Sequence, residues 1–499
     1  MLKYTLKRLL AFIPMIIAIS LIAFIISINA PGDPVESLTK AAGNEGGAEK
    51  QSGTAKKDKQ KLRKKWGLDL PLFYFSVSDM ASCDTLYKVQ DRDQRENLET
   101  LIHEFGNWSE VDKYYKSLLE LQKEQQNIDI ESMCKEDTTL DKNKVNEELN
   151  QIGFNIVGLL EENKKELVDG KYEILEKLIS KRTYFPELIS PYKLVVKKRK
   201  SLSKKSTRWK TYIPSINWYG INSQYHWWVF GDLFHSKKTK RKGIIRGDFG
   251  VSYKDSQPIK DKIWEKVGIS FPLSLLSILI AYLISLPIGI YSAYKKDSKI
   301  DKGISLVLFM LYSLPSFFVG TVLLLFFANP DTLLWFPESG IKDPISYNPN
   351  WSIFNWERIQ HQMPYLVLPL ITYTYGSFAF LSRIMRVGMI EIVSQDYIRT
   401  ARAKGLSENK VILKHALRNS LLPIITVFAA IFPMSVGGSI IIEVIFSIPG
   451  MGTEMFNAIL NYDYPMITAF FTLIGFLTMI GYLVADLLYA VVDPRISYK

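Results

Sequence analysis

The stretch FPLSLLSILIAYLISLPIGIY, residues 271–291, contains no Asp, Glu, Lys or Arg. A helix rises about 1.5 Å per residue and the hydrocarbon core of a bilayer is about 30 Å thick, so this stretch is long enough to cross a membrane. Five further stretches are similarly apolar and carry almost no charge: Leu9–Ile28, Ile304–Ala328, Tyr365–Leu381, Leu421–Phe446 and Met466–Val492. The sequence therefore predicts an all-α membrane protein with six transmembrane helices.

The first apolar stretch has an alternative interpretation as a secretory signal, because Lys3, Lys7 and Arg8 precede it. It is longer than the usual apolar region of a signal, and Pro31 follows Ala30 where a processing enzyme would cut. We expect residues 1–30 to form an uncleaved first transmembrane helix.

Basic residues are concentrated in two of the short loops, and this asymmetry predicts the topology. The chain has a formal net charge of +12, which in a soluble protein would suggest nucleic acid as a partner. Here the basic residues gather in 295–302 and 383–418, whereas 447–465 contains no Lys or Arg. Short basic loops stay in the cytoplasm, so we expect both termini inside, the bacterial inner membrane as the location, and no nucleic-acid partner.

A long polar segment separates the first two spans, and the same topology places it outside the cytoplasm. We divide it into an extracytoplasmic linker (31–78, with Lys40–Lys65 flexible), a helical insertion (79–212) and a return segment (213–268), followed by the core (269–499). Apolar residues recur at helical spacing in the insertion, as at Leu98, Leu101, Ile102 and Phe105. Each such stripe must be buried against another, which predicts a small helical bundle.

Two features of the insertion leave alternatives open. Cys83 and Cys134, the two cysteines of the chain, form a disulfide in an oxidising compartment or remain two ordinary buried thiols. The basic run Lys193–Lys210 is interpreted as a solvated linker that returns to the membrane, with contact to anionic lipid headgroups as the alternative.

Signatures of common catalytic and metal sites are missing from the sequence. It contains no phosphate-binding loop of the form G-x-x-x-x-G-K-[ST], no H-E-x-x-H, no C-x-x-C and no G-x-S-x-G. His226 and His235 lie beside Trp227 and Trp228, a composition more typical of a membrane-interface belt than of a ligand set. We expect no catalytic residue, no metal site and no cofactor bound by this chain.

The segment QDYIRTARAKGLS, residues 395–407, is the most informative polar stretch, and KHALRN follows at 414–419. Gly405 can adopt a left-handed conformation, and Ser407 can cap the helix that follows. The pattern predicts a compact helix-turn-helix projection beside the membrane, of the kind that fits a groove on a partner protein. The alternative is an ordinary basic loop that only fixes the topology.

At this point the sequence resembles the permease subunits of ABC importers of the dipeptide, oligopeptide and nickel type. Besides Tyr397–Ser407, the resemblance rests on motifs in the family's order over about 1–78 and 215–499: Ala30–Pro34, Leu68–Leu72, Gly247–Gly250, Ile448–Gly452, Asp463–Pro465 and Asp493–Arg495. It implies the importer permease fold, with a second homologous permease, ABC ATPase subunits that bind ATP and Mg, an extracytoplasmic solute-binding protein and membrane lipid as partners.

The resemblance also implies a contact to the ATPase and a class of solute. The implied contact residues are Arg399, Thr400, Ala401, Arg402, Ala403, Lys404, Gly405, Leu406, Ser407, His415 and Arg418. The general importer loop has Glu-Ala-Ala before its glycine, whereas Arg399-Thr400-Ala401 stands here, so a glutamate-based contact is not expected. Peptides are the expected solute and nickel the alternative. The insertion has no counterpart in the usual family member, and the competing hypothesis, a membrane-anchored sensor or scaffold, would explain its presence.

The predicted spans also contain polar and helix-breaking residues. Pro272, Pro287, Pro315, Pro369, Pro423 and Pro433 remove backbone hydrogen bonds and act either as hinges or as static kinks. Glu443 and Asp486 are expected near span ends, within reach of water, so an ion-coupled transporter with a central carboxylate is not favoured.

Overall fold

A computed structural model describes residues 2–29, 35, 53–89, 91–131, 141–180, 184–234, 242–348, 350–352 and 355–492. The chain forms two compact units. The first comprises residues 1–46 and 241–499, and the second comprises residues 47–240.

The first unit is built from long apolar helices. Among the described residues, five helical runs are long and apolar enough to cross a membrane, and a sixth is obtained if one bent pair is counted as a single span. The five runs comprise α1 (Leu2–Ile28), α11 (Ile259–Tyr294), α14 (Trp356–Val393), α18 (Leu422–Gly437) continued by α19 (Ile440–Ile445), and α21 (Tyr464–Val492). The remaining helices are α12 (Lys299–Ser313), α13 (Ser316–Phe327), α15 (Asp396–Ala403), α16 (Glu408–Lys410), η5 (Val411–Ala416), α17 (Leu417–Ser420), α20 (Met451–Leu460) and the short η4 (Ile244–Arg246).

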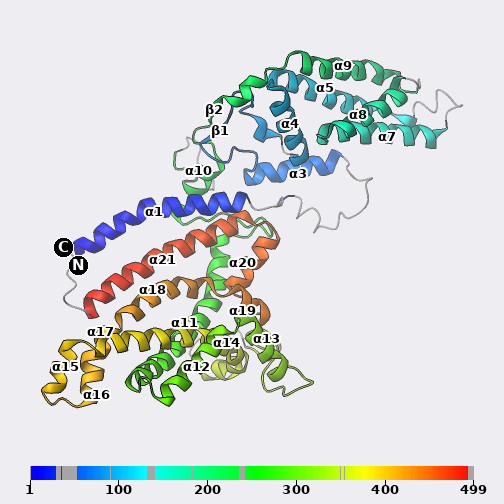
Figure 1. Cartoon of the computed structure of the whole chain (residues 1–499). Coiled ribbons are helices and arrows are strands. Elements are labelled where there is room, and N and C mark those ends of the chain that lie inside the picture. The colour runs from blue at the N-terminus through cyan, green and yellow to red at the C-terminus, as the bar shows by residue number, and fades with distance from the viewer. Residues whose placement is uncertain are drawn as a thin grey trace. The chain divides into compact units, whose positions relative to one another are not determined.

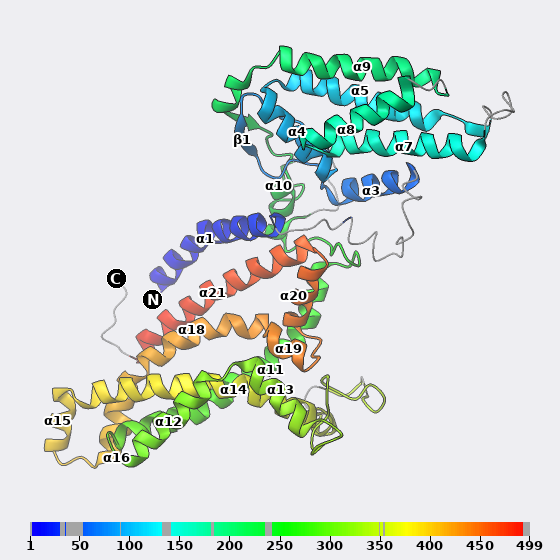
Figure 2. The ribbon, with the colours of Figure 1, turned by 45° about the vertical axis from the view of Figure 1, so that its right-hand side comes forward.

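The long helices pack closely because small residues lie at their contacts. Figures 1 and 2 show α18, α21 and α1 side by side, and α14 packs along α11. A Cβ atom at Gly289 of α11 would lie 2.6 Å from Met385 Cβ on α14, and one at Gly481 of α21 would lie 2.6 Å from the Ala429 carbonyl oxygen. Glycine therefore permits helix approaches that any other residue would obstruct.

The third predicted span is broken in the middle. Ile304–Ala328 was expected to form one helix, but α12 and α13 meet at an angle of 91°. The break falls at Leu314 and Pro315, since proline has no N–H to donate and disfavours a helical conformation in the residue before it. The Leu314 carbonyl accepts instead from the Tyr375 hydroxyl of α14 at 2.8 Å.

The fifth predicted span, Leu421–Phe446, is also interrupted. Gly438 has φ of +66° and ψ of −173°, a conformation that glycine adopts without strain, and it separates α18 from α19. The Ser439 N–H that follows donates to the Tyr373 hydroxyl of α14 at 2.9 Å. α14 therefore supplies the hydrogen-bond partner at both breaks.

The helical bundle of the second unit is preceded and followed by the two strands of an antiparallel ribbon that the sequence did not predict. β1 (Phe75–Asp79) pairs with β2 (Pro214–Trp218), so that Phe75 lies opposite Trp218 and Val77 opposite Ile216. The helices between them are η1 (Leu86–Lys88), α4 (Arg92–Phe105), α5 (Trp108–Asn127), α7 (Lys142–Glu161), α8 (Lys165–Leu175), η2 (Glu176–Ser180), α9 (Pro186–Lys204) and η3 (Arg208–Tyr212), while α3 (Gly53–Trp66) precedes the ribbon and α10 (Gln224–Val229) follows it.

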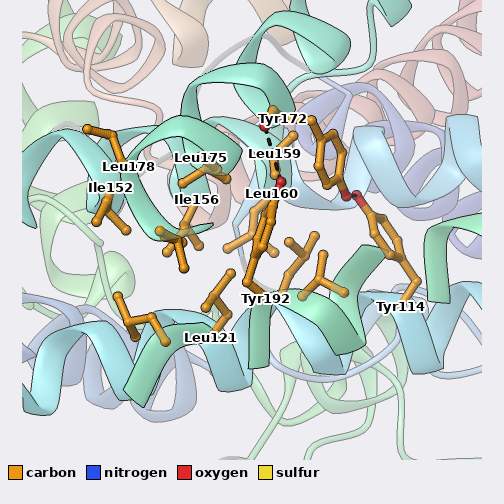
Figure 3. Close-up of a cluster of buried hydrophobic side chains, with 14 of the residues drawn as sticks. Tyr114, Leu121, Ile152, Ile156, Leu159, Leu160, Tyr172, Leu175, Leu178 and Tyr192 are labelled. Atoms are coloured by element: carbon orange, nitrogen blue, oxygen red, sulfur yellow. Dashed lines mark hydrogen bonds between the residues drawn. The ribbon is translucent and has the colours of Figure 1, made fainter. Parts of the chain in front are cut away.

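These helices bury one apolar core, as the stripes in the sequence indicated. Leu121, Ile152, Ile156 and Leu175 are completely or almost completely inaccessible to solvent. Figure 3 shows Tyr114, Tyr172 and Tyr192 meeting at the edge of this cluster. The Tyr114 and Tyr172 hydroxyls lie 2.8 Å apart and the Tyr192 hydroxyl donates to the Tyr172 carbonyl at 3.1 Å, which satisfies these buried polar groups.

Two expectations for the polar segment were wrong. The part of Lys40–Lys65 that the structure describes forms α3 rather than an irregular linker, because its Lys, Gln and Ala residues favour helix when no Gly or Pro interrupts them. Most of Lys193–Lys210 belongs to α9, whose apolar face, with Val195 and Leu202, is buried in the bundle. The basic residues of α9 occupy its outer face and are therefore not a linker.

The choice between a disulfide and two free thiols stays open for the two cysteines. Cys83 Sγ lies 2.8 Å from Thr85 Oγ1 in the turn after β1. Cys134 lies outside the described residues, as do His235, Ala30–Pro34 and Asp493–Arg495.

We predict that residues 47–240 fold on their own, because their apolar core is complete and the ribbon holds the two ends of the bundle together. The fragment should be soluble, helical by circular dichroism and cooperative in unfolding. Residues 79–212, which lack the ribbon, should be less stable. An aggregated or unfolded 47–240 fragment under both oxidising and reducing conditions would contradict the prediction.

We predict an acid-sensitive contribution to the stability of this unit from Glu110, whose side chain is 7% exposed. Its carboxylate accepts from Lys113 and Lys205 and from the Ser201 hydroxyl, which ties α5 to α9. The hydrogen bonds from Lys113 and Ser201 lower the pKa of Glu110 from 4.5 to about 2. The stabilisation is therefore complete above pH 4.5 and is lost as the pH falls towards 2.

The measurement is urea unfolding of the 47–240 fragment across this pH range. Glu110→Gln should be less stable than wild type at neutral pH, and the difference should close on acidification. Asp112→Asn is the matched control, because Asp112 forms only an outer pair with Lys116 on the same helix. A difference for Glu110→Gln that does not change with pH would refute the assignment.

Candidate functional site

The segment after α14 folds as the predicted pair of short helices around a glycine. α15 ends at Ala403, Gly405 has φ of +77°, and α16 begins at Glu408. A Cβ atom at Gly405 would meet nothing within 4 Å, so the residue is required by its backbone conformation and not by crowding. The chain then continues through η5, a wider π-helical turn, and α17 into α18.

The two short helices are anchored on α14 by apolar contacts. Ile398 of α15 and Val411 of η5 are fully buried, and Ala416 is buried beside them. They belong to one cluster with Met385 and Met389 of α14 and Ala281 of α11. Because interiors are close-packed, a displacement of the segment must move α14 with it.

Polar bonds brace the turn across Gly405. Arg402 donates from Nε to Glu408 Oε2 at 3.1 Å and from Nη2 to Glu408 Oε1 at 2.6 Å. This hydrogen-bonded pair lowers the pKa of Glu408, so the carboxylate is ionised at neutral pH. Further along, Asn419 Nδ2 donates to the Tyr397 hydroxyl at 2.8 Å, which joins α17 to α15.

The predicted contact residues divide into an outer and an inner set. Arg399, Thr400, Lys404 and Leu406 are exposed, whereas Ala401 is buried against α14. Arg399 Nη1 lies 3.5 Å from Asp396 Oδ1. His415 and Arg418 lie on η5 and α17, beyond the turn itself. Arg402 and Ala403 also face solvent.

Ser407 takes the predicted position but not the predicted interaction. It precedes the first residue of α16 with extended backbone, and its side chain makes no capping hydrogen bond. α16 is only one turn long, and the Ser407 carbonyl accepts the Val411 N–H at 3.0 Å instead.

A buried ion pair that the sequence did not indicate lies between α12 and α14. Asp301, 2% exposed, accepts from Arg386 Nε at 2.7 Å and from Arg386 Nη2 at 2.6 Å. The Ser292 hydroxyl of α11 donates to the same carboxylate. Three helices are therefore joined at one carboxylate, in the fork geometry that strengthens Arg-carboxylate bonds.

A cavity of about 660 Å³ opens beside this pair. Tyr312 of α12 and Phe380 of α14 stack on its wall with ring centroids 6.0 Å apart. Arg383 and Glu391 of α14 also line it, which adds charge of both signs to an otherwise apolar surface.

The expectation that Glu443 reaches water was wrong. It is fully buried, and its carboxylate accepts from the Ser270 hydroxyl at 2.7 Å and from the Thr453 N–H at 3.0 Å. Ser270 accepts in turn from the Met451 N–H at 2.7 Å. The signal that could have found this group is a lone acidic residue in the apolar run Ile440–Phe446, followed closely by Gly450 and Gly452.

Those two glycines lie against the carboxylate. A Cβ atom at Gly450 would collide with Ser270 Oγ and Glu443, and one at Gly452 would lie 3.0 Å from Glu443 Oε2. The motif Ile448–Gly452 therefore serves to fold α19 and α20 around Glu443. Asp486, by contrast, pairs with Arg8 of α1 at 2.8 Å and keeps partial access to solvent.

The motif Asp463–Pro465 is joined to the segment before α11. Asp463 is buried and accepts from the Ser252 hydroxyl and from the Tyr253 N–H at 3.0 Å. Burial raises the pKa of Asp463 against the effect of these bonds. Nearby, Lys262 of α11 bridges Asp255 at 2.9 Å and Glu454 of α20 at 2.7 Å.

Comparisons with known proteins show the family of the chain. The family described as "Binding-protein-dependent transport system inner membrane component" matches residues 285–498. The oligopeptide transport system permease protein AppB of Bacillus subtilis is 40% identical over 256 residues, which cover 51% of this chain and 78% of AppB. The oligopeptide permease protein OppB of Haemophilus influenzae is 33% identical over 279 residues, 56% of this chain and 84% of OppB.

A third relative and one solved structure are also similar. The dipeptide transport system permease protein DppB of Alkalihalophilus pseudofirmus is 33% identical over 292 residues, 56% of this chain and 84% of DppB. A chain of the methionine ABC transporter MetNI in an inward-facing conformation aligns with 48% of this chain and 99% of its own length, at a TM-score of 0.37 and 15% identity. That likeness in structure is too weak to carry a conclusion.

The assignment rests on the sequence relatives together with the helices of this chain that are able to cross a membrane. The match to AppB covers more than two thirds of that protein, and the matched family region includes the helices that can cross a membrane from α14 onwards and the braced turn at Gly405. The chain belongs to the family of binding-protein-dependent transport system inner membrane components and is a multi-pass permease subunit of an ABC importer.

Proposed function

We propose that this chain forms half of the path of a bacterial peptide importer, and that partner ATPases drive it through the turn around Gly405. The observation that carries the proposal is the construction of this turn. It presents exposed residues on two short helices, yet it is anchored by fully buried Ile398 and Val411 and braced by Arg402–Glu408. A loop that served only to fix the topology would not need such rigidity.

Motion would pass from the turn to the path through rigid elements. The buried cluster couples α15 and η5 to α14, and the Asp301–Arg386 pair couples α14 to α12. α12 leads to the bend at Pro315, so a tilt of α14 would alter the bend and the cavity beside it. This is a rigid-body mechanism in which two arrangements of packed helices are exchanged.

The chemistry of ATP hydrolysis belongs to the partners in this proposal. Arg399, Lys404 and Leu406 would contact a groove on an ATPase subunit, which holds ATP and Mg, and this chain would bind no cofactor. Arg402 is already engaged with Glu408 and would act as a brace more than as a contact.

Peptides are the proposed solute. Three relatives that align with this chain over most of their own length are named as oligopeptide and dipeptide permeases. The cavity between α12 and α14 combines aromatic walls with Arg383 and Glu391, groups that suit the mixed polarity and charged ends of a short peptide. A second homologous permease would close the open side of this cavity, and an extracytoplasmic solute-binding protein would deliver the peptide.

The proposed topology has six spans with both termini in the cytoplasm of a bacterial inner membrane. It counts α12 and α13 as one bent span. It also places the basic segments 295–302 and 383–418 in the cytoplasm, as expected for short loops rich in Lys and Arg. The second unit then lies outside as an insertion. Its independent core supports this placement, as does the alignment with AppB, which covers only 51% of the chain.

We predict that Gly405→Val assembles normally but uncouples the ATPases from transport. A β-branched residue at φ of +77° meets strain of roughly 1–2 kcal/mol, which the turn would relieve by moving α16. The variant should lose peptide transport and the stimulation of ATP hydrolysis by receptor and peptide in reconstituted complexes. Assembly is checked by co-purification of all subunits.

Gly405→Asn is the matched control, because asparagine tolerates the left-handed conformation and no atom lies close enough to clash with it. It should retain most of the coupling. Arg402→Ala should weaken coupling less than Gly405→Val, since an exposed ion pair contributes only about 0–1 kcal/mol. Full coupling in Gly405→Val would show that the turn is only a topological anchor.

We also predict the side of the membrane on which three exposed positions lie. Cysteines replacing Ile345 and Ser447 should react with an impermeant reagent in intact spheroplasts, and one replacing Lys296 should react only after lysis. Lys296 is chosen rather than the nearby Ser298, because the Ser298 hydroxyl caps α12 and should be left in place. The native cysteines are replaced by serine beforehand. Labelling at position 296 in intact spheroplasts, or protection at position 345, would exclude the six-span topology.

A further inference from the structure

The ribbon of the second unit exposes its apolar side chains, which a soluble protein would normally bury. Val77 and Ile216 lie opposite each other and are 68% and 70% exposed. Phe75 and Trp218 form the next pair, with parallel rings 6.2 Å apart, and Trp218 is 73% exposed. The other face carries the polar residues, with Ser76 bonded to Tyr219 and Ser78 to Asn217. An apolar ladder therefore faces outwards.

The segment η3 places two more exposed aromatic side chains next to the ribbon. The Met80 N–H at the end of β1 donates to the Ile213 carbonyl at 2.9 Å, which holds η3 beside the ribbon. Trp209 and Tyr212 of η3 are 58% and 75% exposed. We call the set Phe75, Val77, Trp209, Tyr212, Ile216 and Trp218 the aromatic patch. Contiguous exposed apolar surface of this kind marks a site of interaction.

The patch is held rigidly on the bundle. The Thr207 N–H donates to the Phe105 carbonyl at 2.8 Å and the Thr207 hydroxyl donates to the Gly106 carbonyl at 2.6 Å. Asn107 Nδ2 donates to the Lys205 carbonyl at 2.9 Å. Gly106 has φ of +67°, and any side chain on it would collide with Thr207. The aromatic residues are thus displayed in a fixed arrangement.

The charges near the patch are positive. Lys204 at the end of α9 and Arg208 at the start of η3 are exposed, and Lys210 lies 5.8 Å from the ring of Trp209. Asp79, the acidic residue of the ribbon, is occupied by the turn that follows β1, where it accepts from the N–H groups of Ala81 and Ser82. Aromatic side chains next to Lys and Arg match the boundary between acyl chains and anionic headgroups.

We propose that the aromatic patch docks on the outer surface of the bilayer, with Trp209, Tyr212, Ile216 and Trp218 at headgroup depth and the adjacent basic residues on anionic phosphates. Chain connectivity favours this occupant, because the patch lies between two helices able to cross the membrane, α1, which ends at Ile28, and α11, which begins at Ile259. The proposal does not depend on the solute or on the turn at Gly405. A docked patch would fix the orientation of the insertion over the membrane.

The test uses the full-length chain in nanodiscs of phosphatidylcholine alone or of equimolar phosphatidylcholine and phosphatidylglycerol. Single cysteines at Val77 and, separately, at Ile216 carry an environment-sensitive fluorophore, in a background with both native cysteines replaced by serine. Phe154 is the matched control, because it is 73% exposed and apolar but shares a hollow with Asp93, Glu96 and Glu161. Quenching by a lipid with a nitroxide near its headgroup reports contact with the bilayer.

We expect strong quenching and a blue-shifted emission at both patch positions in the anionic discs, and neither effect at Phe154. The double variant Arg208→Gln/Lys210→Gln should reduce the equilibrium constant for docking by roughly 30-fold in anionic discs, since two positive charges are removed from the surface. High salt should act in the same direction. Thermal unfolding of the variant checks that the fold is intact.

Three outcomes would overturn the proposal. The first is aqueous emission at Val77 and Ile216 in both kinds of disc. The second is a blue shift without lipid quenching, which would show that a protein surface covers the patch. The third is equal quenching at Phe154 and at the patch, which would show that the unit lies against the disc without preference.

Discussion

No water reaches the hydrocarbon core of a membrane, so each backbone group there needs a partner within the protein. This constraint explains why α14 is central to the first unit. The unit has backbone breaks at Leu314–Pro315 and at Gly438, and two tyrosines of α14 bond to the freed groups, Tyr375 to the Leu314 carbonyl and Tyr373 to the Ser439 N–H. The breaks are tolerated because one helix supports both of them.

The same helix contacts both the Gly405 turn and the two backbone breaks. Its last turns hold the cluster under the Gly405 turn and also carry Arg386 against Asp301, whereas Tyr373 and Tyr375 near its middle reach the breaks. The elements that would have to move in transport therefore all contact one long, continuous rod. An irregular α14 could satisfy the backbone locally but could not transmit a displacement over this distance.

Sequence reasoning succeeded where the pattern is local and repetitive. The apolar runs predicted most of the long helices, the stripes predicted the bundle, and the position of Gly405 predicted a left-handed turn. It failed where a residue acts on a distant partner. Nothing near Asp301 in the chain identifies Arg386, and nothing near Glu443 identifies Ser270. The break at Pro315 was seen only as a generic kink, because its 91° angle depends on how α13 packs.

The ribbon also brings the two ends of the helical module close together in space. Entry and exit of the module lie on neighbouring strands, since Phe75 pairs with Trp218. Neighbouring strands are separated by about 5 Å, so a module of this kind occupies no more room in the parent chain than a tight hairpin. Such a module can be gained or lost without moving the helices on either side. The spacing between the two flanking chain segments therefore does not depend on the size of the module. Two residues such as Asn-Gly between shortened strands would be enough to close the gap.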